Sequence, residues 1–137
     1  MAECIFCKIV AGDIPCHKVY EDDHVLAFLD IGPLSHGHTL IVPKTQHPTH
    51  DQVPDDVAAA CGAIVPRLAR AILRATGATA WNLLQNNGPD AGQEVEHVHF
   101  HIIPRESDDN LGFRWHTKSL DSDAALNLKV AISDALR

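Results

Sequence analysis

Three histidines alternate with apolar residues in the segment Glu96-His97-Val98-His99-Phe100-His101-Ile102-Ile103. A two-residue period is typical of a β-strand, so the apolar residues are expected to face a core and the three imidazoles to line the opposite face. At about 3.3 Å per residue, neighbouring imidazoles lie roughly 6.6 Å apart, a spacing that spans one phosphoryl group. Solvated strand faces are more often built from Thr, Lys or Glu, which disfavours a merely His-rich surface.

Two chemistries suit three imidazoles on one strand. Neutral imidazole is a common ligand of zinc, and an imidazole can also attack an electrophile while its neighbours orient the reacting groups. The loop before the histidines, from Asn86 to Gln93, contains Gly88 and Gly92. Because backbone N–H groups of a glycine-rich loop can hold phosphate oxygens, this loop favours covalent chemistry on a phosphate.

Cys4 and Cys7 form a C-x-x-C pair near the N-terminus. A thioredoxin-like redox motif needs a preceding strand, and only three residues precede Cys4. Two interpretations remain: a pair of unrelated core cysteines, or a structural zinc site that two histidines complete as Cys₂His₂. Cys16 and Cys61 are expected to be small core residues, since a chain without an export signal rarely forms disulfides.

The composition limits the classes of function. The 137 residues, 45% hydrophobic and 21% charged, predict one soluble globular domain over residues 1–137. A formal net charge of −7 without a Lys/Arg cluster disfavours nucleic acid as a partner. No apolar run approaches the roughly 20 residues of a membrane span, and the N-terminus shows no signal peptide, so we expect no membrane association and a cytoplasmic location.

The elements that must position these residues follow from periodicity and turn signals. Strands are expected at 19–21, 25–29, 39–42 and 81–85, followed by the histidine strand, which Pro104 would end. Residues 4–11 predict a short helical segment. The long helix begins at Pro54, continues through Pro66 with an expected kink, and ends at Gly77.

After an irregular segment at 105–120, Asp121 is expected to cap a final helix with an apolar stripe at Leu128, Ile132 and Leu136. These elements predict an α+β fold with a five-stranded, mainly antiparallel sheet, one long helix and one C-terminal helix.

Residues 97–103 resemble the His-φ-His-φ-His-φ-φ signature of the histidine triad (HIT) family of nucleotide hydrolases and transferases. Further segments look like family segments in the same order, namely Ile5–Val10, Phe28–Ile31, Gly37–Lys44, Asn86–Gly88 and Ala91–Gln93. Together they extend over about residues 4–105 and are far more specific than a lone His-x-His. The chain length and the segment Cys4–Lys8 favour the Hint-like branch, with its bacterial and archaeal hydrolases.

The resemblance implies a HIT-like fold and a role for each histidine. The middle one, His99, would attack the α-phosphorus of a purine nucleotide, and water would then hydrolyse the nucleotidyl-histidine intermediate. His101 would donate to the phosphate and His38 would support the array. His97 would orient the others or bind a metal.

The resemblance also implies a nucleotide site around these histidines. Asp30 would bind the ribose hydroxyls, although on its own it also fits a turn before Gly32 and Pro33. Asn86 and Gln93 would lie near the phosphate. The base would lie against Phe6, Ile9, Leu29 and Ile31.

A structural zinc ion and a homodimer are further implications, whereas no organic cofactor is implied. Some bacterial and archaeal relatives complete a zinc site with the first triad histidine, here His97, and a histidine two residues after the Pro-Lys pair. That position is Gln46 in this chain. His47 or His50 would therefore have to join Cys4, Cys7 and His97. Family dimers often bring the C-terminus, which here contains Trp115, to the partner's site.

Glu94 departs from the family pattern, which often has a hydroxyl residue there that donates toward the leaving group. An ionised carboxylate cannot donate, and it repels phosphate if it points inward. The expected function is hydrolysis of purine nucleoside phosphoramidates or related nucleotides. The alternatives are a dinucleoside polyphosphate hydrolase and a non-catalytic nucleotide- or zinc-binding protein, which Glu94 favours.

Overall fold

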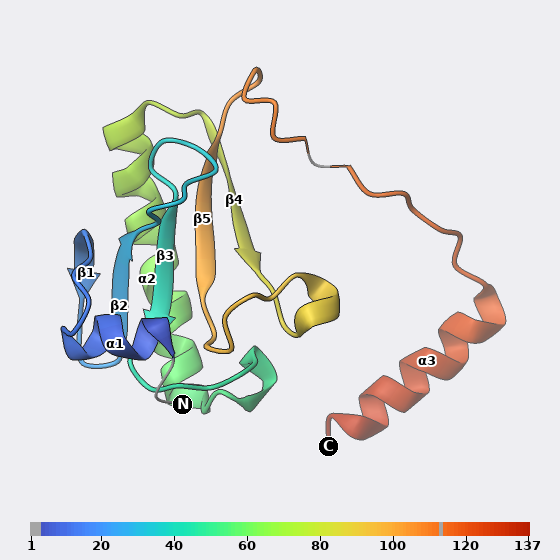
Figure 1. The fold of residues 1–137 in the computed structure, drawn as a ribbon. Coiled ribbons are helices and arrows are strands. Elements are labelled where there is room, and N and C mark those ends of the chain that lie inside the picture. Colours follow the sequence, from blue (N-terminus) through green and yellow to red (C-terminus); the bar gives the residue numbers. More distant parts are fainter. Residues whose placement is uncertain (1–3, 113) are drawn as a thin grey trace.

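The computed structural model describes residues 4–112 and 114–137, and its centre is one antiparallel sheet of strand order β1-β2-β3-β5-β4 (Figure 1). The strands are β1 (Lys18–Glu21), β2 (Val25–Leu29), β3 (Thr39–Pro43), β4 (Ala80–Gln85) and β5 (Phe100–Arg105). The α-helices are α1 (Ile5–Ala11), α2 (Asp55–Thr76) and α3 (Ser122–Ala135), and short 3₁₀ turns lie at His50–Gln52 and Pro89–Ala91. The predicted α+β class and five-stranded sheet are confirmed.

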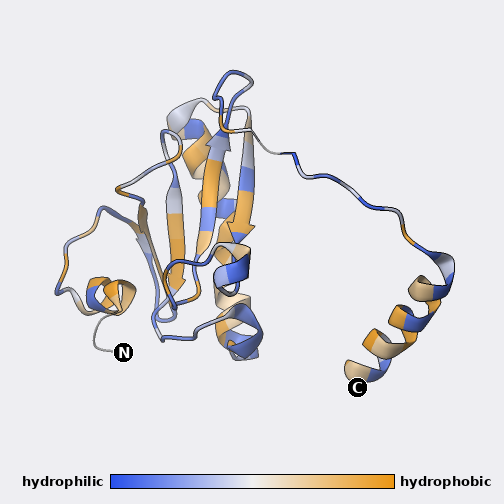
Figure 2. Ribbon diagram, turned by 45° about the vertical axis from the view of Figure 1, so that its right-hand side comes forward, coloured by the Kyte–Doolittle hydropathy of each residue, from blue (hydrophilic) through white to orange (hydrophobic). Residues whose placement is uncertain are grey.

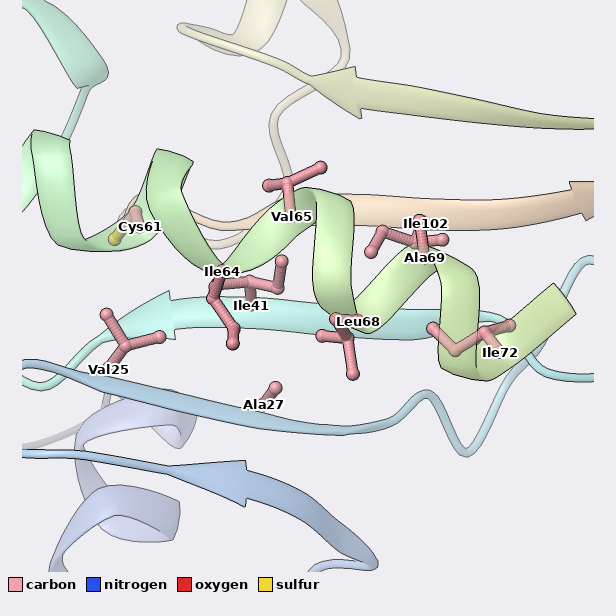
Figure 3. Packing of buried hydrophobic residues seen from close by; sticks show 10 residues of the cluster. All are labelled: Val25, Ala27, Ile41, Cys61, Ile64, Val65, Leu68, Ala69, Ile72 and Ile102. Carbon is pink, nitrogen blue, oxygen red and sulfur yellow. The ribbon is translucent and has the colours of Figure 1, made fainter. Parts of the chain in front are cut away.

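The sheet separates two hydrophobic clusters because its central strands are buried on both faces. On one face, Ala27, Ile41 and Ile102 pack against the apolar stripe of α2 (Figure 3). The other cluster gathers around Phe6 of α1. Its buried members are Phe6, Leu26, Phe28, Leu40 and Val42. Alternate residues of β2 and β3 thus supply both cores.

The long helix begins and ends where its sequence signals predict. Acidic residues Asp55 and Asp56 occupy the first turn, where their negative charges interact favourably with the helix dipole. Gly77 adopts a φ of 77° and its N–H donates to the carbonyl of Leu73, which closes the last turn. Pro66 lies inside α2 without ending it.

The predicted histidine strand is wrong at its start and at its end. Pairing begins only at Phe100, opposite Ile41 and Gln85, so β5 begins four residues later than predicted. Before it, the chain turns, and the Val98 N–H donates to the carbonyl of His47 instead of to a strand. Pro104 lies within β5, beyond its last pair with β3, where β5 has no neighbour on that side and tolerates proline.

The C-terminal segment extends away from the sheet, and α3 stands apart from it (Figures 1 and 2). Asp121 caps α3 as predicted, since its carboxylate accepts from the Ala124 N–H at 3.0 Å. The helix has no buried residue. Its exposed large apolar side chains are Leu126, Leu128, Val130 and Ile132. Among the described residues, no helix has the length and apolarity to cross a bilayer.

Gly37, just before His38, is a position where the fold requires glycine. Its φ is 94°, and a Cβ there would lie 2.6 Å from Thr76 Cγ2 and 3.3 Å from Pro104 Cγ. We predict that Gly37→Ala lowers the free energy of unfolding by about 2–4 kcal/mol, through left-handed backbone strain and overpacking. Urea denaturation followed by circular dichroism measures this.

The matched control for this substitution is Gly62→Ala inside α2, where an added Cβ meets no atom within 4 Å. It should raise stability by about 0.5–1 kcal/mol through lower backbone entropy of the unfolded chain. Equal effects of the two substitutions would contradict the assignment of Gly37 as a close-contact glycine.

Candidate active site

Four imidazoles from three segments lie along β3 and β5, with His38 at the start of β3 and the His97 ring beside Pro43 at its end. His97 and His99 belong to the irregular segment before β5, His101 lies on β5, and His38 directly precedes β3. The ring centroids of His99 and His101 are 5.0 Å apart, and those of His38 and His101 are 5.1 Å apart. His97 is 0% exposed and His99 8%, so these rings do not form the solvated face of a strand.

The main chain determines which nitrogen of His99 carries the proton. Its Nδ1 lies 2.8 Å from the carbonyl oxygen of His97. A carbonyl only accepts, so Nδ1 donates its N–H, and Nε2 of the neutral ring keeps a lone pair. The edge contact with Phe6, at 5.0 Å between centroids, holds the ring from the side of α1. The hydrogen bond and the ring contact thus fix the orientation of His99 and leave its Nε2 unprotonated.

A second chain of hydrogen bonds sets the proton of His101. The Leu34 N–H donates to His38 Nδ1 at 3.0 Å, so the proton of a neutral His38 lies on Nε2. That nitrogen lies 2.9 Å from His101 Nδ1 and donates to it. The proton of His101 therefore lies on its own Nε2, which becomes a hydrogen-bond donor next to His99.

Burial keeps both members of this pair neutral. Burial lowers the pKa of His38, and the nearby Asp30 carboxylate only partly opposes this. Burial, together with the neighbouring His99 and His38 rings, lowers the pKa of His101 to about 4. At neutral pH both imidazoles are therefore uncharged. His38 Nε2 donates to His101 Nδ1, and His101 keeps its own N–H on Nε2.

Asp30 makes the turn that the sequence suggests and also lies next to His38. Its Oδ1 accepts from the Gly32 N–H at 2.8 Å, which makes the turn after β2. Its Oδ2 lies 3.6 Å from His38 Nε2. The turn therefore fixes a carboxylate at the edge of the histidine array, where further hydroxyl donors can reach it.

The four predicted base-contacting residues lie around this edge with different exposure. Phe6 is buried and Ile9 half-buried on α1, whereas Leu29 is 37% and Ile31 88% exposed at the end of β2. A pocket of about 530 Å³ also includes Leu29 and Asp30, but it opens toward Ala71 and Ile72 of α2 and contains neither Phe6 nor Ile31. Phe6 and Ile9 thus lie on the α1 side of the sheet, whereas Leu29 lines the pocket on the α2 side.

The predicted phosphate loop is braced by Gln93. Its amide oxygen accepts from the Gly88 N–H at 2.6 Å, and its amide nitrogen donates to the carbonyls of Pro48 and Val95 at 2.7 and 2.9 Å. Because these bonds occupy the side chain, Gln93 shapes the loop rather than presenting its own amide to a ligand. Asn86 is half-buried, and its amide nitrogen lies near Gly92.

Cys4, Cys7 and His97 form a group whose ligand atoms all lie within 4.8 Å of one another. The Nε2 of His97 lies 2.8 Å from the Pro43 carbonyl and donates to it, which leaves a lone pair on Nδ1. That lone pair faces Cys4 Sγ at 3.3 Å and Cys7 Sγ at 3.6 Å. Two thiols and one imidazole nitrogen match the donors that zinc prefers.

The structure does not bring His47 or His50 into this group. The His47 ring lies 2.8 Å from the Thr45 hydroxyl, and the His50 ring packs against Phe100. Gln46 instead lies beside the group, with its amide oxygen 3.6 Å from Cys7 Sγ.

The sequence alone points to the imidazoles but not to the groups that orient them. These are the carbonyls of Pro43 and His97 and the N–H of Leu34. Every residue has such backbone groups, so no side-chain pattern distinguishes them. Gln46 was visible only as a departure from the expected histidine.

Comparison with known proteins agrees with this fold. The family model described as the HIT domain matches residues 11–108. The chain is 49% identical over 127 residues to adenylylsulfatase HINT3 of Arabidopsis thaliana, covering 90% of this chain and 64% of that protein. It is 42% identical over 135 residues to adenosine 5'-monophosphoramidase hnt1 of Schizosaccharomyces pombe, covering 98% of each. The chain belongs to the HIT family.

Solved structures show the same architecture. SMU.412c from Streptococcus mutans superposes with a TM-score of 0.94 at 42% identity, covering 100% of this chain and 87% of that one. A Zn-bound histidine triad family protein from Mycobacterium smegmatis superposes with a TM-score of 0.76 at 36% identity, covering 99% of both chains. The HIT-like fold predicted from the sequence is therefore confirmed.

The neutral state of His101 predicts an acid-sensitive fold. An unfolded chain protonates this histidine near the ordinary pKa of 6.5, whereas the folded protein resists protonation until about pH 4. Between these values the unfolded state binds more protons, so the free energy of unfolding should fall as the pH falls through this window. Above about pH 6.5 this histidine contributes no pH dependence.

His101→Asn removes the titrating ring and should flatten this slope, even if it also changes stability at every pH. Urea denaturation at about pH 7 and about pH 5 gives the slope for both proteins. Identical slopes would show that His101 is not the group held neutral.

Proposed function

We propose that this chain is a hydrolase that cleaves purine nucleotides at the α-phosphorus, with nucleoside phosphoramidates as the substrate class. The observation that carries the proposal is the pair of ring nitrogens oriented by hydrogen bonds, a lone pair on Nε2 of His99 and an N–H on Nε2 of His101. The names of two relatives, an adenosine 5'-monophosphoramidase and an adenylylsulfatase, support this class.

The reaction proceeds in two displacements at phosphorus. Nε2 of His99 attacks as the bond to the leaving amine breaks, and the amine takes its proton from solvent. The nucleotidyl-imidazole is then positive, and the His97 carbonyl stabilises it through the Nδ1–H bond. Water attacks the phosphorus, the P–N bond to His99 breaks, one proton returns to solvent, and the lone pair is restored.

The remaining residues bind and position the nucleotide. His101 donates to a phosphate oxygen, and His38 is the positioning residue that keeps the proton of His101 on the required nitrogen. Asp30 accepts from the ribose hydroxyls. The phosphate lies against Asn86, at the start of the loop that Gln93 braces. The base packs against Phe6, Ile9, Leu29 and Ile31.

A structural zinc ion fits the thiols of Cys4 and Cys7 and the Nδ1 of His97. The Zn-bound relative supports this part of the proposal. Bound there, the metal ties the first turn of α1, and with it Phe6, to the histidine segment. The ring of His97 faces the metal site and its carbonyl faces His99, so the chemistry at phosphorus needs no metal contact.

We propose that the chain forms a homodimer in which α3 packs against the partner subunit. Four large apolar side chains along α3 remain exposed in the single chain, an arrangement typical of an interface. Residues 1–137 would then act as one domain whose C-terminal arm, with Trp115, contacts the partner. Sedimentation velocity of the full chain tests this, and a monomer at micromolar concentration would contradict it.

The first functional prediction concerns His99. His99→Ala should lower single-turnover hydrolysis of adenosine phosphoramidate by roughly 10³- to 10⁴-fold, because the covalent route is lost. Acid-quenched reactions of the wild type should contain a nucleotidyl adduct that the variant lacks. His24→Ala changes an exposed histidine outside the site and should keep wild-type turnover.

Near-wild-type hydrolysis by a folded His99→Ala variant would overturn the proposal. If the wild type binds AMP tightly but turns over neither the phosphoramidate nor a diadenosine polyphosphate, the nucleotide-binding alternative holds. Faster turnover of the diadenosine polyphosphate than of the phosphoramidate would favour the polyphosphate hydrolase.

The second prediction concerns the choice of leaving group. Glu94 is exposed directly after the phosphate loop, and its negative charge disfavours leaving groups that depart as anions, such as sulfate. Glu94→Ser should raise turnover of adenylyl sulfate relative to adenosine phosphoramidate by roughly 3–10-fold. Glu96→Ser, two residues along the chain and also exposed, is the control with the same change in charge. An equal shift in both variants would assign the effect to net charge alone.

A further inference from the structure

Gln46 contributes a fourth polar atom to the group of Cys4, Cys7 and His97. Its Nε2 donates to the carbonyl of Glu96 at 3.0 Å. Because a carbonyl only accepts, the NH₂ end of the amide is held there and the oxygen end must point the other way. That oxygen lies 3.6 Å from Cys7 Sγ. The amide is therefore oriented with its acceptor toward the thiols.

The other three donors are also positioned by bonds that leave them free to coordinate. His97 is held by the Pro43 carbonyl on its Nε2 side and presents Nδ1 to both thiols. Cys4 is the N-cap residue of α1, where its sulfur accepts from the Cys7 N–H at 3.3 Å. The group thus offers two sulfurs, one imidazole nitrogen and one amide oxygen on a framework that exists without any ion.

The alternative fourth ligand, His47, is directed elsewhere. Its carbonyl accepts from the Val98 N–H at 2.9 Å, which anchors its main chain, and its ring Nε2 lies 2.8 Å from the Thr45 hydroxyl. Neither ring nitrogen of His47 lies within 4.8 Å of all the other ligand atoms, so a contribution from His47 would require its side chain to move. Gln46 requires no such change, since its oxygen already faces Cys7.

We infer that Gln46 is the fourth protein ligand of this site, which binds a thiophilic divalent transition metal through two sulfurs, one nitrogen and one amide oxygen. A neutral amide oxygen is a harder and weaker ligand for zinc than imidazole. The site therefore binds its metal less tightly than a Cys₂His₂ site and exchanges it more readily. This inference deepens the proposed zinc site, and it is independent of the proposed hydrolysis.

The test is Co²⁺ titration of the reduced, chelator-treated full chain without nucleotide, with affinities for Co²⁺ and Zn²⁺ obtained by chelator competition. Gln46→His should bind at least about tenfold more tightly than the wild type, because imidazole replaces the amide oxygen. Its visible cobalt bands should also shift as nitrogen replaces oxygen. Gln46→Ala should bind several-fold more weakly, and His47→Gln should match the wild type.

Each result decides a different point. Wild-type affinity and spectra in both Gln46 variants would overturn the assignment of Gln46 as a ligand. Weaker binding by His47→Gln alone would assign the fourth position to His47 instead. Absence of the near-ultraviolet sulfur-to-cobalt band from the wild type would show that the cysteine sulfurs bind no metal. This result would contradict the metal site and would not bear on hydrolysis. Circular dichroism establishes that each variant is folded, so a change in affinity reports on the ligand.

Discussion

The hydrogen bond from His99 Nδ1 to the carbonyl of His97 is the interaction on which the site depends. It directs the free lone pair of His99 to Nε2 and gives a growing positive charge an acceptor on the opposite side of the ring. His97 can serve this purpose because its own position is fixed. Its ring nitrogen donates to the Pro43 carbonyl at the end of β3, so the central sheet sets the orientation of the His99 ring.

Uncharged hydrogen-bond donors would allow this acidic protein to bind the proposed anionic substrate. The chain has a formal net charge of −7, and burial holds His38 and His101 in their uncharged forms at neutral pH. A charged imidazolium on His101 would attract phosphate more strongly, but its second N–H would clash with the N–H of His38. The proposed site therefore relies on the directed N–H group of His101, which loses no orientation when the substrate arrives.

The sequence predicted those parts of the molecule that hydrophobic periodicity and turn chemistry determine. The strand positions, the limits of α2 and the N-cap of α3 follow from such local signals and are confirmed. The predicted start of β5 was wrong because the alternation of apolar and polar residues continues back through His97. Strand pairing does not reach that far, since the Val98 N–H donates to the loop carbonyl of His47. The bonds of Gln46 and Gln93 join segments far apart in the chain, so no local pattern contains them.

The irregular backbone before β5 explains how one residue serves two sites. On a regular strand, His97, His99 and His101 would project in parallel, and the carbonyl of His97 would face a neighbouring strand. The turn before Phe100 frees that carbonyl to bond to His99, while the ring of His97 turns toward the thiols of α1. A continuous strand from Glu96 would pair these groups with its neighbours and separate the imidazoles. The early end of pairing is therefore what brings the His97 carbonyl to His99 and the His97 ring to the thiols.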